Sequence, residues 1–260
     1  MRELGICLPA KIGDGLDEFL RIMAENGFTK TFVTQSADTD RIAERVYRAG
    51  ISLDTLHAPF GRRTNNMWLL GDDGDAAQRE LFDCLDACKR VGATIAVVHL
   101  SSGSTPPPVT DIGRRRFTEL VEYAEKIGVK IAFENQRMLS NIAWAFEEFK
   151  TDAVGFCWDT GHEFCFTGGR QYMPLFGDRL ICTHLHDNFA KYDEDSHLIP
   201  FDGTADFERV ARQIRESGFE GALMLEIIKE RPAYADMPAR EYLERAARAA
   251  KRLRDMIDKK

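Results

Sequence analysis

The chain has 260 residues, of which 44% are hydrophobic and 30% charged, and this balance excludes disorder as its dominant state. Its apolar runs are far shorter than the roughly 20 residues needed to cross a bilayer, so we expect no membrane partner. The net charge of -7 repels phosphate backbones at long range and argues against nucleic acid as a partner.

Short apolar runs alternate with longer amphipathic runs in eight successive units. The predicted strands are 4–8, 29–34, 52–57, 94–99, 130–134, 154–159, 180–186 and 222–226. The predicted helices are 16–26, 39–49, 75–91, 112–127, 142–149, a short segment after the sixth strand, 207–217 and 240–258. A long loop follows the third strand, and the proline-rich stretch 101–108 is predicted to be a loop after the fourth.

A Gly marks the end of five predicted helices, just before the next strand begins. These residues are Gly27, Gly50, Gly92, Gly128 and Gly218. A repeated helix–Gly–strand order favours parallel strands joined by crossover helices. Because no linker or charge block divides residues 1–260, we predict a single α/β domain, a closed (β/α)8 or TIM barrel.

The distribution of histidines is the most informative feature of the sequence. The six are His57, His99, His162, His184, His186 and His197. Five lie at the carboxyl ends of predicted strands or one turn beyond, the sixth lies in the loop after the seventh strand, and none lies in a long predicted helix. Active sites of (β/α)8 barrels lie at this end of the strands, so we expect the imidazoles to meet there.

Carboxylate side chains also lie at the carboxyl ends of the predicted strands. Glu134, Asp159 and Glu226 end apolar strands, where an unpaired buried charge would be unfavourable. A divalent cation would offset that charge, and imidazole with carboxylate suits Zn, Mn, Co or Fe. Taken singly, each residue has a structural interpretation; Asp159 could cap a helix, and Asn188 is interpreted as a turn residue.

Other candidates come from the loops. Trp68 and Arg62 lie in or near the long loop after the third strand, and both are predicted to contact substrate. The alternative for Trp68 is packing in the core, and the alternative for Arg62 is a solvated surface position. Asn135 and His186 are predicted substrate contacts because they adjoin strand ends. The six cysteines contain no C-x-x-C pair and no secretory signal is visible, so we expect reduced thiols and a cytoplasmic protein. An exposed helix face would support a homodimer.

Several short motifs occur in order over most of the chain. They read HAPF, VVHLSSG, FEN, WDTGH, THLHDN, DSHLIPFDGTADF and LE, from His57 to Glu226. In order and spacing the set resembles the sugar phosphate isomerase/epimerase family of the xylose-isomerase-like TIM-barrel superfamily, to which AP endonuclease family 2 is related.

The resemblance implies a ligand set. Similar epimerases hold one metal by residues that match Glu134, Asp159, His184 and Glu226, with His162 on a substrate oxygen. The AP-endonuclease branch builds three metal sites. By position, His57, His99 and Glu134 would hold one ion, the four residues above a second, and His162, Asp195 and His197 a third. The resemblance thus implies one to three ions of Mn, Zn, Co or Mg.

The resemblance also implies a reaction. We predict an isomerase or epimerase for a sugar, sugar phosphate or polyol, in which Glu134 and Glu226 exchange a proton with a metal-stabilised enediolate. Epimerases often carry an Arg in the loop after the seventh strand, where this chain has Lys191, Asp195 and His197. The alternatives are a multi-metal phosphodiesterase of the AP-endonuclease type, an inosose-type dehydratase and a non-catalytic sugar-binding barrel.

Overall fold

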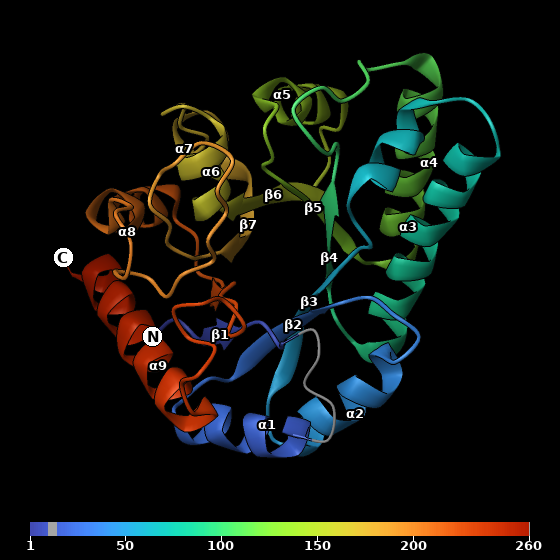
Figure 1. Cartoon of the computed structure of the whole chain (residues 1–260). Helices are drawn as coiled ribbons and strands as arrows, with labels where there is room; N and C mark the ends of the chain where they lie inside the picture. Colours follow the sequence, from blue (N-terminus) through green and yellow to red (C-terminus); the bar gives the residue numbers. More distant parts are fainter. Residues whose placement is uncertain (10–14, 260) are drawn as a thin grey trace.

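A computed structural model describes residues 1–9 and 15–259, in which helices surround a ring of parallel strands (Figure 1). The strands are β1 (Leu4–Ile6), β2 (Lys30–Thr34), β3 (Ser52–His57), β4 (Ile95–His99), β5 (Lys130–Glu134), β6 (Val154–Asp159), β7 (Leu180–His184) and β8 (Leu223–Leu225). Their order around the sheet is β7-β6-β5-β4-β3-β2-β1-β8.

The two outer strands of that order meet and nearly close the barrel. A parallel bridge joins Leu185 to Leu225, just beyond β7. The Leu185 amide donates to the Met224 carbonyl at 2.8 Å, and the Glu226 amide donates to the Leu185 carbonyl at 3.1 Å. The predicted α/β barrel is therefore confirmed.

Helices follow the strands and cover the outside of the barrel. They are α1 (Leu16–Glu25), α2 (Thr39–Arg48), α3 (Asp72–Val91), α4 (Asp111–Ile127), α5 (Leu139–Glu148), α6 (Thr160–Phe166), α7 (Met173–Phe176), α8 (Phe207–Ser217) and α9 (Ala239–Asp258), with 3-10 helices η2 (Arg62–Trp68) and η3 (Gly177–Arg179). Gly92 and Gly128 end α3 and α4 in the left-handed conformation, with φ of 80° and 73°, as the glycine pattern predicts.

Some boundaries differ from those predicted. The long third loop contains η2, and α3 begins at Asp72 instead of residue 75. Gly74 therefore lies inside the first turn of α3, where a Cβ would come within 2.3 Å of the Arg116 guanidinium. The predicted strand 180–186 ends at His184, because the chain then leaves the sheet through the Leu185 bridge.

Two buried clusters form the core. The larger one lies between the sheet and the helices. The smaller one contains Val97, Ala132, Cys157 and Cys182, one from each of β4 to β7. Their chain neighbours Ala96, Val98, Ile131, Phe133, Phe156 and Trp158 belong to the larger cluster. Because alternate residues of a strand face opposite sides, the smaller cluster fills the inside of the barrel.

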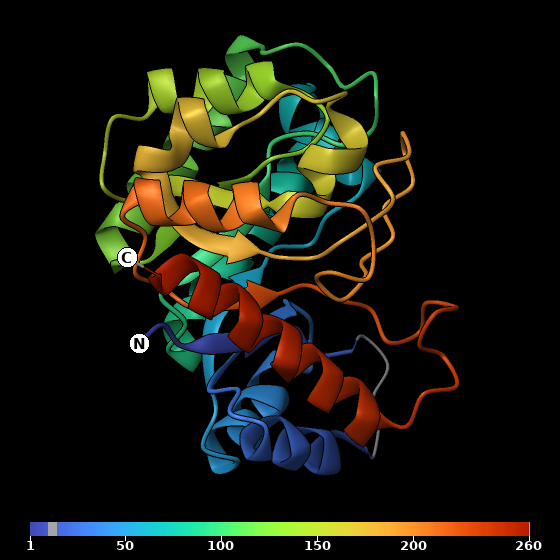
Figure 2. The same cartoon turned by 90° about the vertical axis from the view of Figure 1, so that its left-hand side faces the viewer.

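The loops at the carboxyl ends of the strands project to one side of the molecule, and both chain termini lie on the other side (Figure 2). The segment between β7 and α8 and the segment between β8 and α9 both extend on the loop side (Figure 2). Across residues 1–9 and 15–259, no helix combines the length and apolar content that a membrane crossing needs.

Candidate metal centre and active site

Strand geometry places the site. The interior residues Val97, Ala132, Cys157 and Cys182 are followed, two positions later, by His99, Glu134, Asp159 and His184. Residues two apart on a strand share a face, so these four side chains also point into the barrel, at its carboxyl end. The strand register sets His99 beside Glu134 and Asp159 beside His184. The predicted convergence of imidazoles and carboxylates therefore follows from pairing and periodicity.

Glu134 is the centre of this cluster, and its side chain is 1% exposed. Its Oε2 lies 3.2 Å from His57 Nε2, 3.3 Å from His99 Nε2 and 3.2 Å from His184 Nδ1. Donor atoms of His57, Glu134 and His184 all lie within 4.8 Å of one another. The resemblance implies His99 as the third member of this group, but the structure has His184 there. His99 Nε2 lies 3.2 Å from the Gln136 amide nitrogen.

A second group contains Glu134, Asp159, His184 and Glu226, with one donor atom from each within 4.8 Å of the others. His184 Nδ1 lies between the two glutamates, 3.2 Å from Glu134 Oε2 and 3.3 Å from Glu226 Oε2. The four residues end β5, β6 and β7 or directly follow β8. This is the ligand set that the resemblance implies for the metal of an epimerase.

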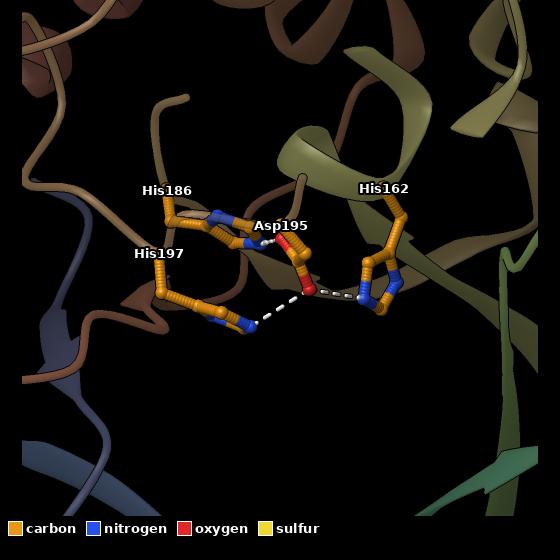
Figure 3. Close-up of side chains that lie close together, drawn as sticks. All are labelled: His162, His186, Asp195 and His197. Carbon is orange, nitrogen blue, oxygen red and sulfur yellow. Dashed lines mark ion pairs between the residues drawn. The ribbon is translucent and has the colours of Figure 1, made fainter. Parts of the chain in front are cut away.

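A third group lies beside the second and contains His162, His186, Asp195 and His197 (Figure 3). Asp195 Oδ2 lies 2.8 Å from His197 Nε2 and 3.2 Å from His162 Nε2, and its Oδ1 lies 3.8 Å from His186 Nε2. His186 Nε2 also lies 3.0 Å from Asp159 Oδ1, which connects the second and third groups. His186, predicted only as a substrate contact, therefore lies among the candidate metal ligands.

The loop that carries Asp195 and His197 is held by one buried carboxylate. Asp187 Oδ1 accepts from the amides of Asn188 and Ala205, and Oδ2 accepts from those of Phe201 and Gly203, at 2.8 to 3.0 Å. His197 has a positive φ of 47°, which non-glycine residues adopt only when the surrounding structure holds them there. Asn188 Oδ1 accepts from the Ala190 amide, as expected for a turn residue.

Burial and charge act in opposite directions on the cluster. Burial alone would raise the pKa of Glu134, but the charge of His99 and the neighbouring imidazoles of His162 and His184 hold it well below its ordinary value. Burial would lower the pKa of His184, but the carboxylates of Glu226 and Glu134 raise it well above normal. His197, beside Asp195, has its pKa raised to about 9 despite its burial. The carboxylates therefore favour the protonated form of His184 and His197.

Unsatisfied polar atoms test whether a metal fits. Among the described residues, buried atoms without a hydrogen-bond partner include His184 Nδ1 and Nε2, His186 Nδ1, Asp195 Oδ1 and Glu226 Oε2. Such atoms are unfavourable unless a ligand or water satisfies them, and they belong to the second and third groups. Each of these two groups combines imidazole nitrogens with carboxylate oxygens, the ligands by which proteins bind Zn and Mn. The residues present therefore fit a divalent cation.

One predicted substrate contact is wrong. Trp68 is 1% exposed and lies in the core, where its ring packs against Phe117 and Trp144 and its Nε1 donates to the Leu100 carbonyl. The indole is buried because η2 folds back onto α4, and a Cβ on Gly113 would lie 2.1 Å from it. The core-packing alternative is the one that the structure shows.

Two other predicted contacts have different surroundings. Asn135 is fully buried and exchanges hydrogen bonds with the backbone of Asp159, at 2.8 Å in each direction. This pairing ties the end of β5 to the end of β6, which makes Asn135 a positioning residue. Arg62 is exposed and lines a cavity together with Arg137.

Gln136 is a functional candidate that the sequence interpretation missed. Its Nε2 donates to Glu134 Oε1 at 3.1 Å and lies close to His99 and His162. The signal was its position two residues after Glu134, on the same side of the extending chain. Glu163 was missed as well; it accepts from Trp158 Nε1 and pairs with Arg209 of α8 at 2.6 Å.

Comparisons with known proteins agree with this architecture. The family described as xylose isomerase-like TIM barrel matches residues 9–256. A protein of Sinorhizobium fredii named y4fM, described as uncharacterised, is 26% identical over 94% of this chain and 90% of its own length. A D-tagatose 3-epimerase-like protein superposes with a TM-score of 0.74 at 18% identity over 98% of both chains. The D-psicose 3-epimerase of Clostridium cellulolyticum H10, solved with D-tagatose, gives 0.75 at 14% identity over the whole of both chains. At these identities the two solved structures show a shared fold.

Proposed function

The chain belongs to the xylose isomerase-like TIM barrel family, and on this basis we propose that it is a divalent-metal-dependent sugar isomerase or epimerase. The observation that carries the proposal is the group of Glu134, Asp159, His184 and Glu226, whose donor atoms lie within 4.8 Å of one another at the carboxyl ends of the strands. Two proteins of similar structure, the D-tagatose 3-epimerase-like protein and the D-psicose 3-epimerase, support the same reaction class.

The four residues of the second group would hold the ion, which we expect to be Mn, Zn, Co or Mg. When bound, the ion supplies a Lewis acid that polarises the substrate carbonyl and stabilises negative charge on neighbouring oxygens. We expect His162, which lies 2.9 Å from Glu134 Oε1, to contact a substrate oxygen. Gln136 donates to the same Oε1 of Glu134 at 3.1 Å and helps to orient that carboxylate.

Proton transfer is assigned to the two glutamates. One glutamate, as the carboxylate, takes the proton next to the substrate carbonyl. The other enters the step as the carboxylic acid, returns its proton to the substrate and becomes the carboxylate. Their nearest oxygens lie within 4.8 Å of each other, and the two residues come from strands separated by β6 and β7 on one side of the barrel. Neighbouring imidazoles, chiefly His99 at Glu134 and His184 at Glu226, hold the pKa of each carboxyl below its ordinary value against the effect of burial, so the glutamate that takes the proton is ionised before the step.

A cavity of about 380 Å³ adjoins Glu226 and gives a small substrate access to it. Phe32 lines this cavity and stacks on the His184 ring with 4.5 Å between centroids. The remaining lining is mostly apolar and includes Leu8, Ile227 and Phe60. A volume of this order accommodates a small-molecule ligand.

Glu134→Gln and Glu226→Gln test the scheme. Each variant removes a base while keeping the side-chain volume, so we expect turnover to fall by about 100- to 10,000-fold. Activity is measured on a panel of ketoses, inososes and their phosphates, with circular dichroism to check folding. In D2O the wild-type enzyme should incorporate deuterium next to the carbonyl, and neither variant should do so at the wild-type rate.

The matched control is Glu147→Gln, at an exposed glutamate of α5 that pairs with Lys150. It should keep wild-type rates. Near-normal turnover by either active-site variant would show that the two-glutamate scheme is wrong. Loss of water across the substrate, without isomer formation, would assign the protein to the dehydratases.

The third group of residues favours a second candidate function, a multi-metal phosphoester hydrolase. His162, His186, Asp195 and His197 supply ligands beyond those that one ion needs, as in a multi-metal phosphoester hydrolase. Elemental analysis of the purified protein measures the number of ions per chain. A plasmid-nicking assay on abasic DNA with Zn or Mn then separates the functions, because nicking abolished by His162→Asn would support the hydrolase.

A further inference from the structure

A second cavity, of about 470 Å³, is lined by polar side chains and shares no lining residue with the apolar one. Its lining includes Arg62, Ser102, Ser104, Thr105, Arg137 and Asp193. These residues come from η2 and from the segments after β4, β5 and β7. Four separate segments at the carboxyl end of the barrel therefore share one polar cavity.

The two arginines keep donors free for a ligand. Arg62 is exposed and has no ion-pair partner among the described residues. Arg137 directs Nε and Nη2 to a single oxygen of Asp193, with Nε at 3.0 Å, which leaves Nη1 without a partner in the described part of the chain. Its guanidinium carbon lies 3.7 Å from the centre of the Phe166 ring, which fixes the direction of the fork.

The hydroxyl side of the cavity is also held in place. The Asn65 side chain donates to the Ser102 carbonyl at 2.9 Å and accepts from the Ser102 amide at 2.8 Å. This reciprocal pair fixes the segment after β4 against η2, the element that carries Arg62. Ser102, Ser104 and Thr105 thus add three hydroxyl-bearing residues to the lining that contains the arginines.

The cavity is one aromatic ring away from the metal cluster. Phe166, under the Arg137 guanidinium, stacks on His162 with 4.9 Å between centroids and 23° between planes. Arg137 also directly follows Gln136, which donates to Glu134. A substrate whose carbonyl lies at the cluster could therefore reach this cavity with a group a few bonds away.

Local charge favours an anion here although the whole chain carries -7. A neighbouring cavity of about 340 Å³ shares Ser104 and Arg137 and adds exposed Arg170. Across the two linings three arginines face one carboxylate, that of Asp193. Planar guanidinium forks bind phosphate in a bidentate manner, and hydroxyl donors can satisfy the remaining phosphate oxygens.

We propose that Arg62, Arg137 and the Ser102–Thr105 hydroxyls form a subsite for the phosphate ester of the substrate, so that the enzyme acts on a phosphorylated sugar. This inference rests on the proposed function and names its substrate class. The alternative ligand of similar chemistry is a sugar carboxylate.

Arg62→Gln and Arg137→Gln test the subsite in two assays. In the first, kinetics compare each ketose with its phosphate ester. We expect KM for the ester to rise at least about tenfold in each variant, with kcat/KM for the free ketose within about twofold of wild type. In the second, calorimetry measures the Kd of inorganic phosphate, which we expect to weaken about tenfold.

Arg63→Gln is the matched control, because Arg63 neighbours Arg62 in η2 but pairs with Glu80 of α3 at 3.0 Å. It should leave both measurements unchanged. If Arg137→Gln fails to fold, Arg62→Gln decides the outcome alone. Unchanged phosphate affinity in Arg62→Gln, or a sugar carboxylate bound more tightly than phosphate, would overturn the proposal. If the variants bind phosphate more weakly but the wild-type protein turns over no sugar, the subsite is supported and the proposed isomerase or epimerase function is refuted.

Discussion

At the scale of single residues, Asp187 shows how one buried side chain supports a site that it does not enter. Its two oxygens accept four backbone amides of the segment that carries Asp195 and His197. The chain also pairs Asp187 with Leu198 by two backbone hydrogen bonds of 2.8 Å. The positions of two candidate ligands therefore depend on a carboxylate outside the cluster.

Asp187→Ala should lower the free energy of unfolding by about 2–4 kcal/mol, because it leaves buried amides without an acceptor. Urea denaturation measures the loss. The metal content of the variant should also decrease, because Asp195 and His197 lose their fixed geometry.

Glu194→Ala is the control on the same segment, since Glu194 is exposed and pairs only with Lys191 among the described residues. It should change stability by less than about 0.5 kcal/mol. A similar small change in Asp187→Ala would show that other contacts hold the segment.

At the scale of elements, the junction of β6 and α6 serves structure and chemistry together. Asp159 ends β6 and caps α6, because its Oδ1 accepts from the His162 amide at 2.6 Å. The same carboxylate belongs to the second candidate metal group. The helix-cap and metal-ligand interpretations of Asp159 are therefore compatible, and α6 must keep its place for His162 to reach Glu134.

The ion pair of Glu163 and Arg209 connects α6 to α8, and Glu163 is 2% exposed. Arg209→Met leaves that carboxylate buried without its cation, so we expect a loss of about 3–5 kcal/mol. Thermal or urea unfolding measures it. Arg212→Met, an exposed position on the same helix, should stay within about 0.5 kcal/mol of wild type; equal losses in both variants would contradict the assignment.

At the scale of the whole molecule, barrel closure brings residues from distant parts of the chain around shared donors. His57 and Glu226 lie at opposite ends of the motif series, yet both contact the Glu134–His184 pair. A bound ion would therefore tie β3 and the β5–β8 side of the barrel together. Ligand binding to the folded state stabilises it by mass action.

Adding Mn or Zn at about 100 times its Kd to chelator-treated protein should contribute about 2.7 kcal/mol and raise Tm by about 5–10 °C. Differential scanning calorimetry measures the shift. His184→Ala, which removes a residue shared by two groups, should lose most of it. Equal shifts in both proteins would place the ion elsewhere.

The sequence by itself determined the order of strands and helices and the end of the barrel at which the chemistry lies. Hydrophobic periodicity and glycine stops are local signals, and a parallel barrel assigns strand ends to one face without further information. The positions of Glu134, Asp159, His184 and Glu226 could therefore be predicted.

Only the tertiary structure decided which side chains touch. Trp68 is in the core because η2 packs onto α4, and His186 lies near Asp195 because the loop after β7 pairs back on itself at Asp187 and Leu198. Gln136 contacts Glu134 although the chain has already left β5 at that point. Arg62 and Arg137 line one cavity although they are distant in sequence. Such contacts depend on loop paths and buried hydrogen bonds, which no local pattern encodes.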